Sequence, residues 1–432
     1  MLLESLLEFY HVLAKVILEG GWVIFGMALL YMFYKMYMDY INLRWFQRQK
    51  WVFLKIVGPR DSEKSQLTFE QMFNQIHSMH SSFNFVEKYI MGDMQIWFTW
   101  EITSIGGAIA NYVSVIERHR DTIEAAIYSQ FPDAEIGETE DYMPKLPHWH
   151  PDADFDIYAF DFIQKKDPAY PIRTYREFEH STAETFVDPV VGIWEELGKI
   201  NQHEMFIMQY IFKPLDDDWK KHAQHLVDKL KGAPEHSSEP TLIGEIFRRS
   251  LRGLVNIFIP GSPVEEGPVH HDTPPRSQMI FLTDQERGSL QAVETKLSKL
   301  SYAVKIRCLY IAPKAKFTPG PIYTAVIGAI KSVTSSHLNA LKPDTDHWTK
   351  VKPWLLPKWE KPIIQLRLNH RKLHFLHAMR LRWFFGGPHA AILNTEEIAT
   401  ILHFPTLESK VPPVEKVQAV KAQPPAELPV AE

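Results

Sequence analysis

Cysteine is almost absent from this chain, and so is a large net charge. Its 432 residues include one cysteine, Cys308, so a framework of intrachain disulfides and a cysteine-based zinc cluster are both excluded. The formal net charge is −5, which leaves no global field to attract nucleic acid, and any such contact has to be local. Hydrophobic residues make up 45% and charged residues 23%, as in globular proteins. A chain of this length is expected to form two or three domains.

Long uncharged apolar runs are also missing, except within the first fifty residues. Residues 20–34 carry no charge. A helix over 16–38 would rise about 34 Å, enough to cross a hydrocarbon core of about 30 Å. Several basic residues follow the run, whereas Lys15 is the only one before it, so the positive-inside rule places the rest of the chain in the cytoplasm. The sequence therefore predicts a transmembrane helix over 16–40 and a single-pass protein of the inner (cytoplasmic) membrane.

Two other interpretations of this region were weighed, a cleaved signal peptide and a buried helix. A signal peptide would begin with positive charge and end in small residues, and neither is seen. Leucines recur at helical spacing over residues 1–15, which predicts an amphipathic helix on the far membrane face. The same pattern fits equally the first turns of one long helix.

The next ninety residues follow the order β-α-β-β-α-β. The expected elements are a strand at 51–57, a helix beginning near 68, strands at 94–102 and 108–115, a helix at 118–130 and a strand at 134–136. This is the split βαβ, or ferredoxin-like, arrangement, in which both helices cover one face of the sheet. We therefore expect an α+β fold in which the N-terminal transmembrane helix is followed by ferredoxin-like sheet-and-helix modules, the first over 51–140.

The sequence predicts fewer of the strands and helices in the remaining modules. Residues 155–232 repeat the sheet-and-helix theme, so a structural duplication is expected. A proline-rich linker over 233–282 interrupts regular structure. A third α+β module spans 283–406 and includes an alternating strand in which Cys308 is a packed thiol. Residues 407–432 have too few apolar side chains to fold and are expected to be a disordered tail.

Four blocks of sequence resemble one known family. They are SIGGAIANY to GETEDY at 104–142, PAYPIRTYREFE at 168–179, VKIRCLYIAPK at 304–314 and LNTEEIATILHFPT at 393–406. Together they resemble the non-motor, membrane-proximal region of conjugative-transfer, type IV secretion-like membrane ATPases, above all those of candidate-phyla bacteria. The resemblance covers most of residues 50–406. In that family, the LNTEE-type block precedes the nucleotide-binding motor domain.

The resemblance implies a function in a larger apparatus, but it implies no catalytic activity for this chain. The sequence contains no G-x-x-x-x-G-K-[ST] loop, so the backbone amides and lysine that hold nucleotide phosphates are missing. What the resemblance implies is a membrane-anchored, non-catalytic docking component of a conjugation-like apparatus. Its partners would be the membrane, a separate conjugative-type ATPase and further copies of the same chain.

Acidic residues are missing from 361–395, and this gap coincides with a basic stripe. The stripe contains Lys361, Arg367, Arg371, Lys372, Arg380 and Arg382, interleaved with histidines and aromatic residues. Such a pattern is typical of contact with single-stranded nucleic acid, and it fits anionic lipid or a protein partner as well. A solvated helix face is the simplest interpretation. The alternative function is thus a DNA-handling adaptor that binds single-stranded nucleic acid through 361–384.

Histidines at two places have the residue types of a metal site. His148 and His150 stand two apart near Asp152, Asp154 and Asp156, but prolines surround them and a rigid site is hard to hold there. We interpret this segment as a polar loop between modules. The pair at 270–271 falls in the proline-rich linker. No catalytic residue, cofactor or metal site is therefore expected.

Overall fold

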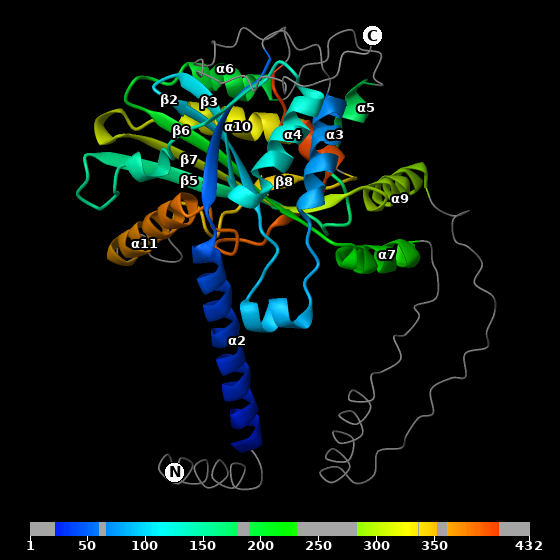
Figure 1. The fold of residues 1–432 in the computed structure, drawn as a ribbon. Coiled ribbons are helices and arrows are strands. Elements are labelled where there is room, and N and C mark those ends of the chain that lie inside the picture. Colours follow the sequence, from blue (N-terminus) through cyan, green and yellow to red (C-terminus); the bar gives the residue numbers. More distant parts are fainter. Residues whose placement is uncertain are drawn as a thin grey trace, which may run out of the picture.

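One antiparallel sheet organises the molecule (Figure 1). The computed structural model describes residues 22–59, 66–179, 190–230, 283–335, 337–351 and 361–405. The sheet has nine strands in the described residues, which run β4-β1-β3-β2-β6-β7-β5-β8, with β9 paired to β7. The α+β class expected from the sequence is confirmed. The amphipathic helix expected over 1–15, the linker over 233–282 and the tail over 407–432 lie outside the described residues.

The central strands of this sheet are buried along almost their whole length, because both faces of the sheet are covered. The strands are β1 (Trp51–Val57), β2 (Phe98–Ile105), β3 (Ala108–Ile116), β4 (Glu135–Glu138), β5 (Phe155–Gln164), β6 (Met205–Pro214), β7 (Ser301–Pro313), β8 (Leu341–Pro343) and β9 (Ala391–Asn394). The helices are α2 (Trp22–Arg48), α3 (Gln66–Ile76), α4 (Arg120–Gln130), α5 (Tyr175–Glu179), α6 (Val191–Gly198), α7 (Asp218–Leu230), α9 (Asp284–Leu297), α10 (Gly320–Ser332), α11 (Lys361–Arg380) and α12 (Thr395–Ile401).

The sheet consists of two halves with the same strand order. In the first half, β1-α3-β2-β3-α4-β4, the strands lie side by side as β4-β1-β3-β2. In the second half, β5, β6, β7 and β8 take the equivalent places as β8-β5-β7-β6. Antiparallel pairing of β2 with β6, from Phe98 opposite Phe212 to Ile105 opposite Met205, joins the halves. Strands from all three ranges expected as modules therefore share one sheet, because β7 and β8 complete the half that β5 and β6 begin.

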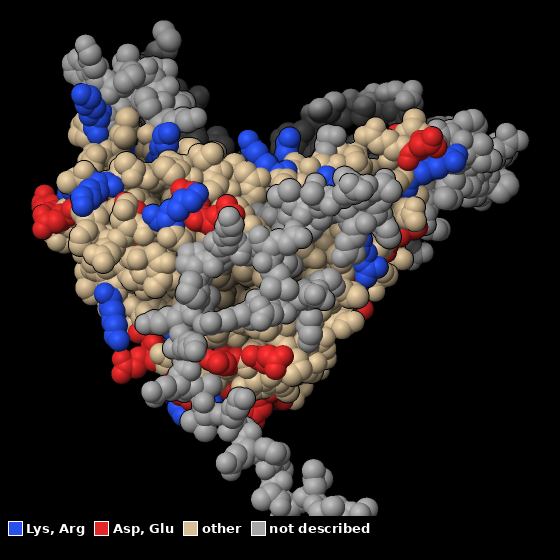
Figure 2. Space-filling view, turned by 90° about the horizontal axis from the view of Figure 1, so that it is seen from above, with Lys and Arg blue, Asp and Glu red and all other residues tan. Residues whose placement is uncertain are grey.

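The two faces of the sheet are covered differently. Helices α3, α4, α6, α10 and α12 cover one face, where a continuous core contains stacked aromatic rings such as those of Phe98 and Phe212. On the other face, which we call the α11 face, α11 and the segment 142–149 pack over a smaller core that includes Trp149 and Phe375. On the side of the molecule seen in Figure 2, positive and negative side chains are interspersed around the margin. No patch of a single charge stands out among the residues coloured there.

Helix α2 corrects the expectation of a transmembrane helix over 16–40. In Figure 1 it projects from the body as a stalk. Within the described ranges, no helix combines the length and the apolar character needed to cross a membrane. Lys35 and Asp39 fall inside α2 among several tyrosines, so the uncharged part of the described helix covers only 22–34. The last turns pack on the body, where Ile41 and Trp45 are buried.

The LNTEE block closes the fold. Asn394 caps α12 through a capping box with Glu397, each side chain accepting a hydrogen bond from the other residue's backbone N–H. The Glu397 carboxylate also accepts from the backbone of Ile172 and lies 3.0 Å from the Lys296 ammonium. Next to it, Glu396 pairs with Arg176. Two of the resembling blocks, 168–179 and 393–406, thus hold one another in place.

Candidate functional site

A row of polar side chains crosses the α11 face at right angles to the strands. Glu101 in β2 lies opposite Tyr112 in β3 on one side and opposite Gln209 in β6 on the other. Gln209 lies opposite Arg307 in β7, which in turn lies opposite Asp161 in β5. Residues directly opposite on neighbouring strands share a face of the sheet. Five strands therefore place polar groups side by side where apolar side chains would be expected.

One end of this row is closed by an arginine from the loop after α11. The Glu101 carboxylate is 0% exposed and accepts hydrogen bonds from Tyr142, Gln209 and Arg382. Arg382 also donates to both oxygens of Asp141, at 2.7 and 2.8 Å. Burial disfavours ionisation of Asp141, but the hydrogen bonds from Arg382 outweigh it and lower the pKa of that carboxyl. These hydrogen bonds and ion pairs hold Arg382 to β2 and to Asp141, so this end of the row stabilises the fold.

The other end of the row is less completely satisfied. The Arg307 guanidinium donates to three carbonyl oxygens of α11 and its following loop, those of Ala378, Trp383 and Gly386. Its Nε lies 3.5 Å from Oδ1 of Asp161. That oxygen is buried and accepts no hydrogen bond from the described residues. Because Asp161 is 4% exposed, burial raises the pKa of its carboxyl to about 6, although nearby cations oppose the shift.

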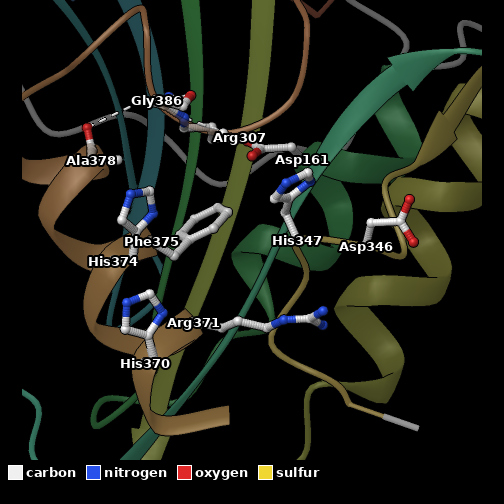
Figure 3. Close-up of a pocket in the computed structure, with 11 residues that line it drawn as sticks. Asp161, Arg307, Asp346, His347, His370, Arg371, His374, Phe375, Ala378 and Gly386 are labelled. Atoms are coloured by element: carbon white, nitrogen blue, oxygen red, sulfur yellow. Dashed lines mark hydrogen bonds and ion pairs between the residues drawn. The ribbon is translucent and has the colours of Figure 1, made fainter. Parts of the chain in front are cut away.

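A pocket of about 360 Å³ opens beside Asp161 (Figure 3). Its walls come from β5, β7, α11, the segment after β8 and the loop after α11. The lining residues are Asp161, Arg307, Asp346, His347, His370, Arg371, His374, Phe375, Ala378, Gly386 and Gly387. The volume is within the range of small-molecule sites in proteins.

Imidazole rings and a guanidinium form the pocket's sides. His370 and His374 are one turn apart on α11, and their rings lie nearly parallel with centroids 6.1 Å apart. Burial, together with the neighbouring His370, lowers the pKa of His374, so its ring is neutral at pH 7. His347 directs Nδ1 to the Asp344 carboxylate, 2.5 Å away. Arg371 reaches across from α11 and donates to the carbonyl of Trp348.

Gly387 packs closely against the Asp161 carboxylate. Its φ of +82° lies in the region that favours glycine. A Cβ built there would stand 3.0 Å from Oδ2 of Asp161, closer than ordinary van der Waals contact. The absence of a side chain at this position therefore lets the loop after α11 approach the carboxylate closely.

The basic stripe expected over 361–384 does not form one surface. Lys361 and Arg367 are exposed, and Arg371 is half-buried beside the pocket. The other three cations bind within the protein. Lys372 pairs with Asp156, Arg380 donates to the carbonyls of Leu146 and Pro147 and contacts His148, and Arg382 pairs with Glu101 and Asp141.

The His148 segment lies beneath α11. The Trp149 ring is buried against the Lys372 ammonium, and its indole N–H donates to Asp156. Among the residues that the structure describes, no group of three or more His, Cys, Asp or Glu side chains is placed to hold a metal ion. The histidine pair at 270–271 lies outside the described residues.

Sequence reasoning missed the pocket's floor, namely Asp161, Arg307 and Gly387. A signal was present, because Asp161 interrupts an apolar strand between Ala159 and Ile163, and Arg307 follows Lys305 on one face of another largely apolar strand. Such a charge predicts a partner buried with it. The pattern does not say which strand supplies that partner, because pairing between distant strands is not visible in one sequence.

No curated protein matches this chain, whereas one family does. The model of the family described as Domain of unknown function (DUF8128) matches residues 42–324. The match covers β1 to β7 and the first turn of α10, and hence the sheet residues of the polar row. As it extends over more than half of the 432 residues, the chain belongs to this family of unknown function.

Proposed function

We propose that this protein is a non-catalytic docking component of a conjugation-like, type IV secretion-like apparatus and works with a separate ATPase. Support comes from the four sequence blocks and from the absence of a phosphate-binding loop in the sequence. The blocks at 168–179 and 393–406 bind one another inside the body. They therefore serve the fold, and partner contact has to come from other surfaces.

The observation that carries the docking proposal is the division of α11. Its second half is fixed to the sheet through Phe375, Leu376 and Met379. Its first half projects, with Ile363 59% and Leu366 69% exposed beside the cation Arg367. A helix that presents apolar anchors one turn apart next to basic side chains has the features that a groove on a partner recognises.

Co-purification tests this assignment. The full chain is co-expressed with the conjugative-type ATPase encoded nearest to it, and the ATPase is expected to co-purify. The double substitution Ile363→Glu and Leu366→Glu should abolish this, because charge at the anchors opposes their burial. Leu67→Glu, at an exposed apolar position on α3, is the matched control. If the wild type, the double variant and the Leu67→Glu control all recover the same amount of ATPase, docking through α11 is refuted.

The same proposal includes self-association through α2. This helix presents exposed apolar side chains along its length, among them Phe25, Leu30 and Phe33. Contiguous apolar surface of this kind is typical of an interaction site. Leu30→Glu with Phe33→Glu should lower the molar mass of the purified protein to that of a monomer, as measured by light scattering. An unchanged mass would exclude α2 as the contact. Placement at the inner membrane stays a prediction, checked by cell fractionation.

A DNA-handling adaptor is the second candidate function. It is favoured by the exposed stripe cations Lys361 and Arg367, together with Arg371, which lies half-buried beside the pocket. Reversal of their charge should weaken binding of a single-stranded oligonucleotide, and added salt should weaken it as well. A triple reversal at the exposed residues Lys221, Lys331 and Lys342 is the control. Binding that responds to neither salt nor the stripe variant would remove this function. Lys372 is left intact because it is buried against Asp156.

A further inference from the structure

We propose that the protein binds the surface of a lipid bilayer through a short helix that projects from the body beside α2. This helix covers residues 85–91 and includes the turn η3 (Glu87–Met91), and we call it the 85–91 helix. The contact lies within one leaflet and requires no helix that crosses the bilayer. The inference rests on the proposed function, because it names the surface by which the protein would be placed at the membrane.

Exposed apolar side chains gather on the 85–91 helix. Phe85 is 71% exposed and Ile90 61%, and Val86 and Met91 are exposed beside them. The helix belongs to the segment between α3 and β2, on the side of the body from which α2 projects. In Figure 1 it is the light-blue helix that lies crosswise to α2. Adjoining apolar groups on a projecting element are typical of an interaction site.

The segment that carries this helix is held in a defined conformation. Asn84 and Glu87 exchange hydrogen bonds between side chain and backbone at the start of the helix, each at 2.9 Å. At the base of the segment, the Gln95 side chain accepts from the backbone N–H of Ser81 and donates to the carbonyl of Met79. The apolar side chains are therefore presented to solvent by a fixed support.

Helix α2 and the 85–91 helix form one surface. The Tyr37 hydroxyl on α2 donates to the carbonyl of Tyr89 at 3.2 Å. Gly92 ends the 85–91 helix with a φ of +78°, and a Cβ built there would stand 2.6 Å from the backbone of Ile41. A glycine is needed for this close approach. The two helices therefore meet the same surroundings.

The exposure of α2 favours lipid as those surroundings. Residues 29–34 are all apolar or aromatic, and all are exposed. Successive residues of a helix point about 100° apart, so six of them cover every side. A groove on a protein, or a second copy of this chain, covers one side of a helix, whereas lipid tails surround it. Exposed tyrosines such as Tyr34 and Tyr37 are typical of the level at which lipid meets water.

Charge near this surface is close to balanced. Residues 22–49 and 80–95 carry four basic side chains, Lys35, Arg44, Arg48 and Lys88, and three acidic ones, Asp39, Glu87 and Asp93. The local net charge is thus +1, against −5 for the whole chain, so this part of the protein is not repelled by anionic headgroups. Apolar insertion therefore supplies most of the binding, and added salt should weaken it only slightly.

A fluorescent label on the 85–91 helix tests the contact. Because Cys308 is buried, Ile90→Cys provides one accessible cysteine for a nitrobenzoxadiazole label. Vesicles of phosphatidylcholine and phosphatidylglycerol are added to the labelled full-length protein. We expect the emission to shift to the blue and to be quenched by nitroxide-labelled lipid. Tyr128→Cys, at an exposed position on α4, is the matched control and should show neither effect.

Removal of apolar groups gives a second measurement. Phe85→Ser with Ile90→Ser should lower the partition of the protein into these vesicles, measured by flotation, by at least about tenfold, because two apolar side chains no longer leave water. Leu67→Ser with Tyr128→Ser removes exposed apolar side chains from α3 and α4 and should leave flotation unchanged.

The outcomes separate this inference from the function beneath it. An unshifted label on a protein that still floats with the vesicles would overturn the contact through the 85–91 helix and keep the placement at the membrane. A protein that shows neither a shift nor flotation would overturn both. Flotation that the Phe85 and Ile90 substitutions leave unchanged also overturns the contact. A blue shift that needs no vesicles and grows with protein concentration would assign the surface to a second copy of this chain.

Discussion

At the scale of single residues, Lys296 and Glu397 form an ion pair in which neither side chain is accessible to water. Both side chains are fully buried, and the ammonium also donates to the carbonyl of Ile392. Burial raises the pKa of Glu397 and lowers that of Lys296, while the attraction between them opposes both shifts. Since Glu397 also caps α12, the pair couples helix α9 to the end of the fold.

Removal of one partner of this pair should be costly. We expect Lys296→Met to lower the free energy of unfolding by about 3–5 kcal/mol, because Glu397 is then a buried charge without a counter-ion. The double substitution Lys296→Met with Glu397→Gln should cost less than the single one, since no charge is left behind. Urea denaturation followed by circular dichroism measures both. A single substitution costing under about 1 kcal/mol would contradict the assignment.

Asp161 should make stability depend on pH. Its folded pKa of about 6 exceeds the ordinary value near 3.9, so the folded protein binds more protons between these two values. The unfolding free energy of the wild type, measured relative to Asp161→Asn, should therefore fall as pH rises from 4 to 6. The slope is about 1.4 kcal/mol per pH unit, or roughly 3 kcal/mol in all. A difference that does not change with pH would show that Asp161 keeps an ordinary pKa.

The residue scale also shows what one sequence can predict. Arg307 and Asp161 stand out as charges in apolar strands, and a buried partner follows from the cost of burying a lone charge. Their opposition across β7 and β5 does not follow, because Arg307 comes 146 residues after Asp161 and register is set by pairing rather than by local pattern. Arg382 was expected in a basic stripe, yet it lies buried against Glu101.

At the scale of elements, α11 should be stable at one end and loose at the other. Residues 375–379 bury apolar side chains on the sheet, whereas residues 361–367 are mostly exposed. Amides whose hydrogen bonds are exposed open more often. Hydrogen exchange measured by mass spectrometry should therefore show faster exchange in peptides from 361–370 than in those from 373–380. Equal protection along the helix would mean that a further contact holds its first half.

Elements with strong periodicity were predicted best. The strand expected at 51–57 is β1, with the same bounds, since its seven apolar or alternating residues stop at Gly58-Pro59. Helix α2 shows the opposite case. Its composition resembles a membrane span over short windows, but Lys35 and Asp39 shorten the uncharged run below the length of a bilayer crossing. Whether such a helix is long and apolar enough to cross a membrane thus depends on a few of its residues.

At the scale of the whole molecule, the pairing of β2 with β6 decides the architecture. The first half of the sheet would otherwise end at β2 and the second at β6, each with an open edge. Joined, they share one core that runs from Phe73 beneath β2 to Ile330 beneath the second half. No local pattern specifies this junction, because both strands are apolar on the core face and several registers would bury them.

Because β6 pairs on both sides, the centre of the sheet should tolerate proline far less than its edge. Met208 lies opposite Ile102 in β2 and Cys308 in β7, so Met208→Pro interrupts the ladder that joins the halves. We expect a loss of about 3 kcal/mol or more in unfolding free energy. Lys342→Pro, in the edge strand β8, should cost clearly less. Met208→Leu controls for side-chain size.

For the wild type, tryptophan fluorescence and circular dichroism should report one coincident urea transition, because the core is shared. Two separate transitions, or equal losses from the two proline variants, would show that the halves fold independently.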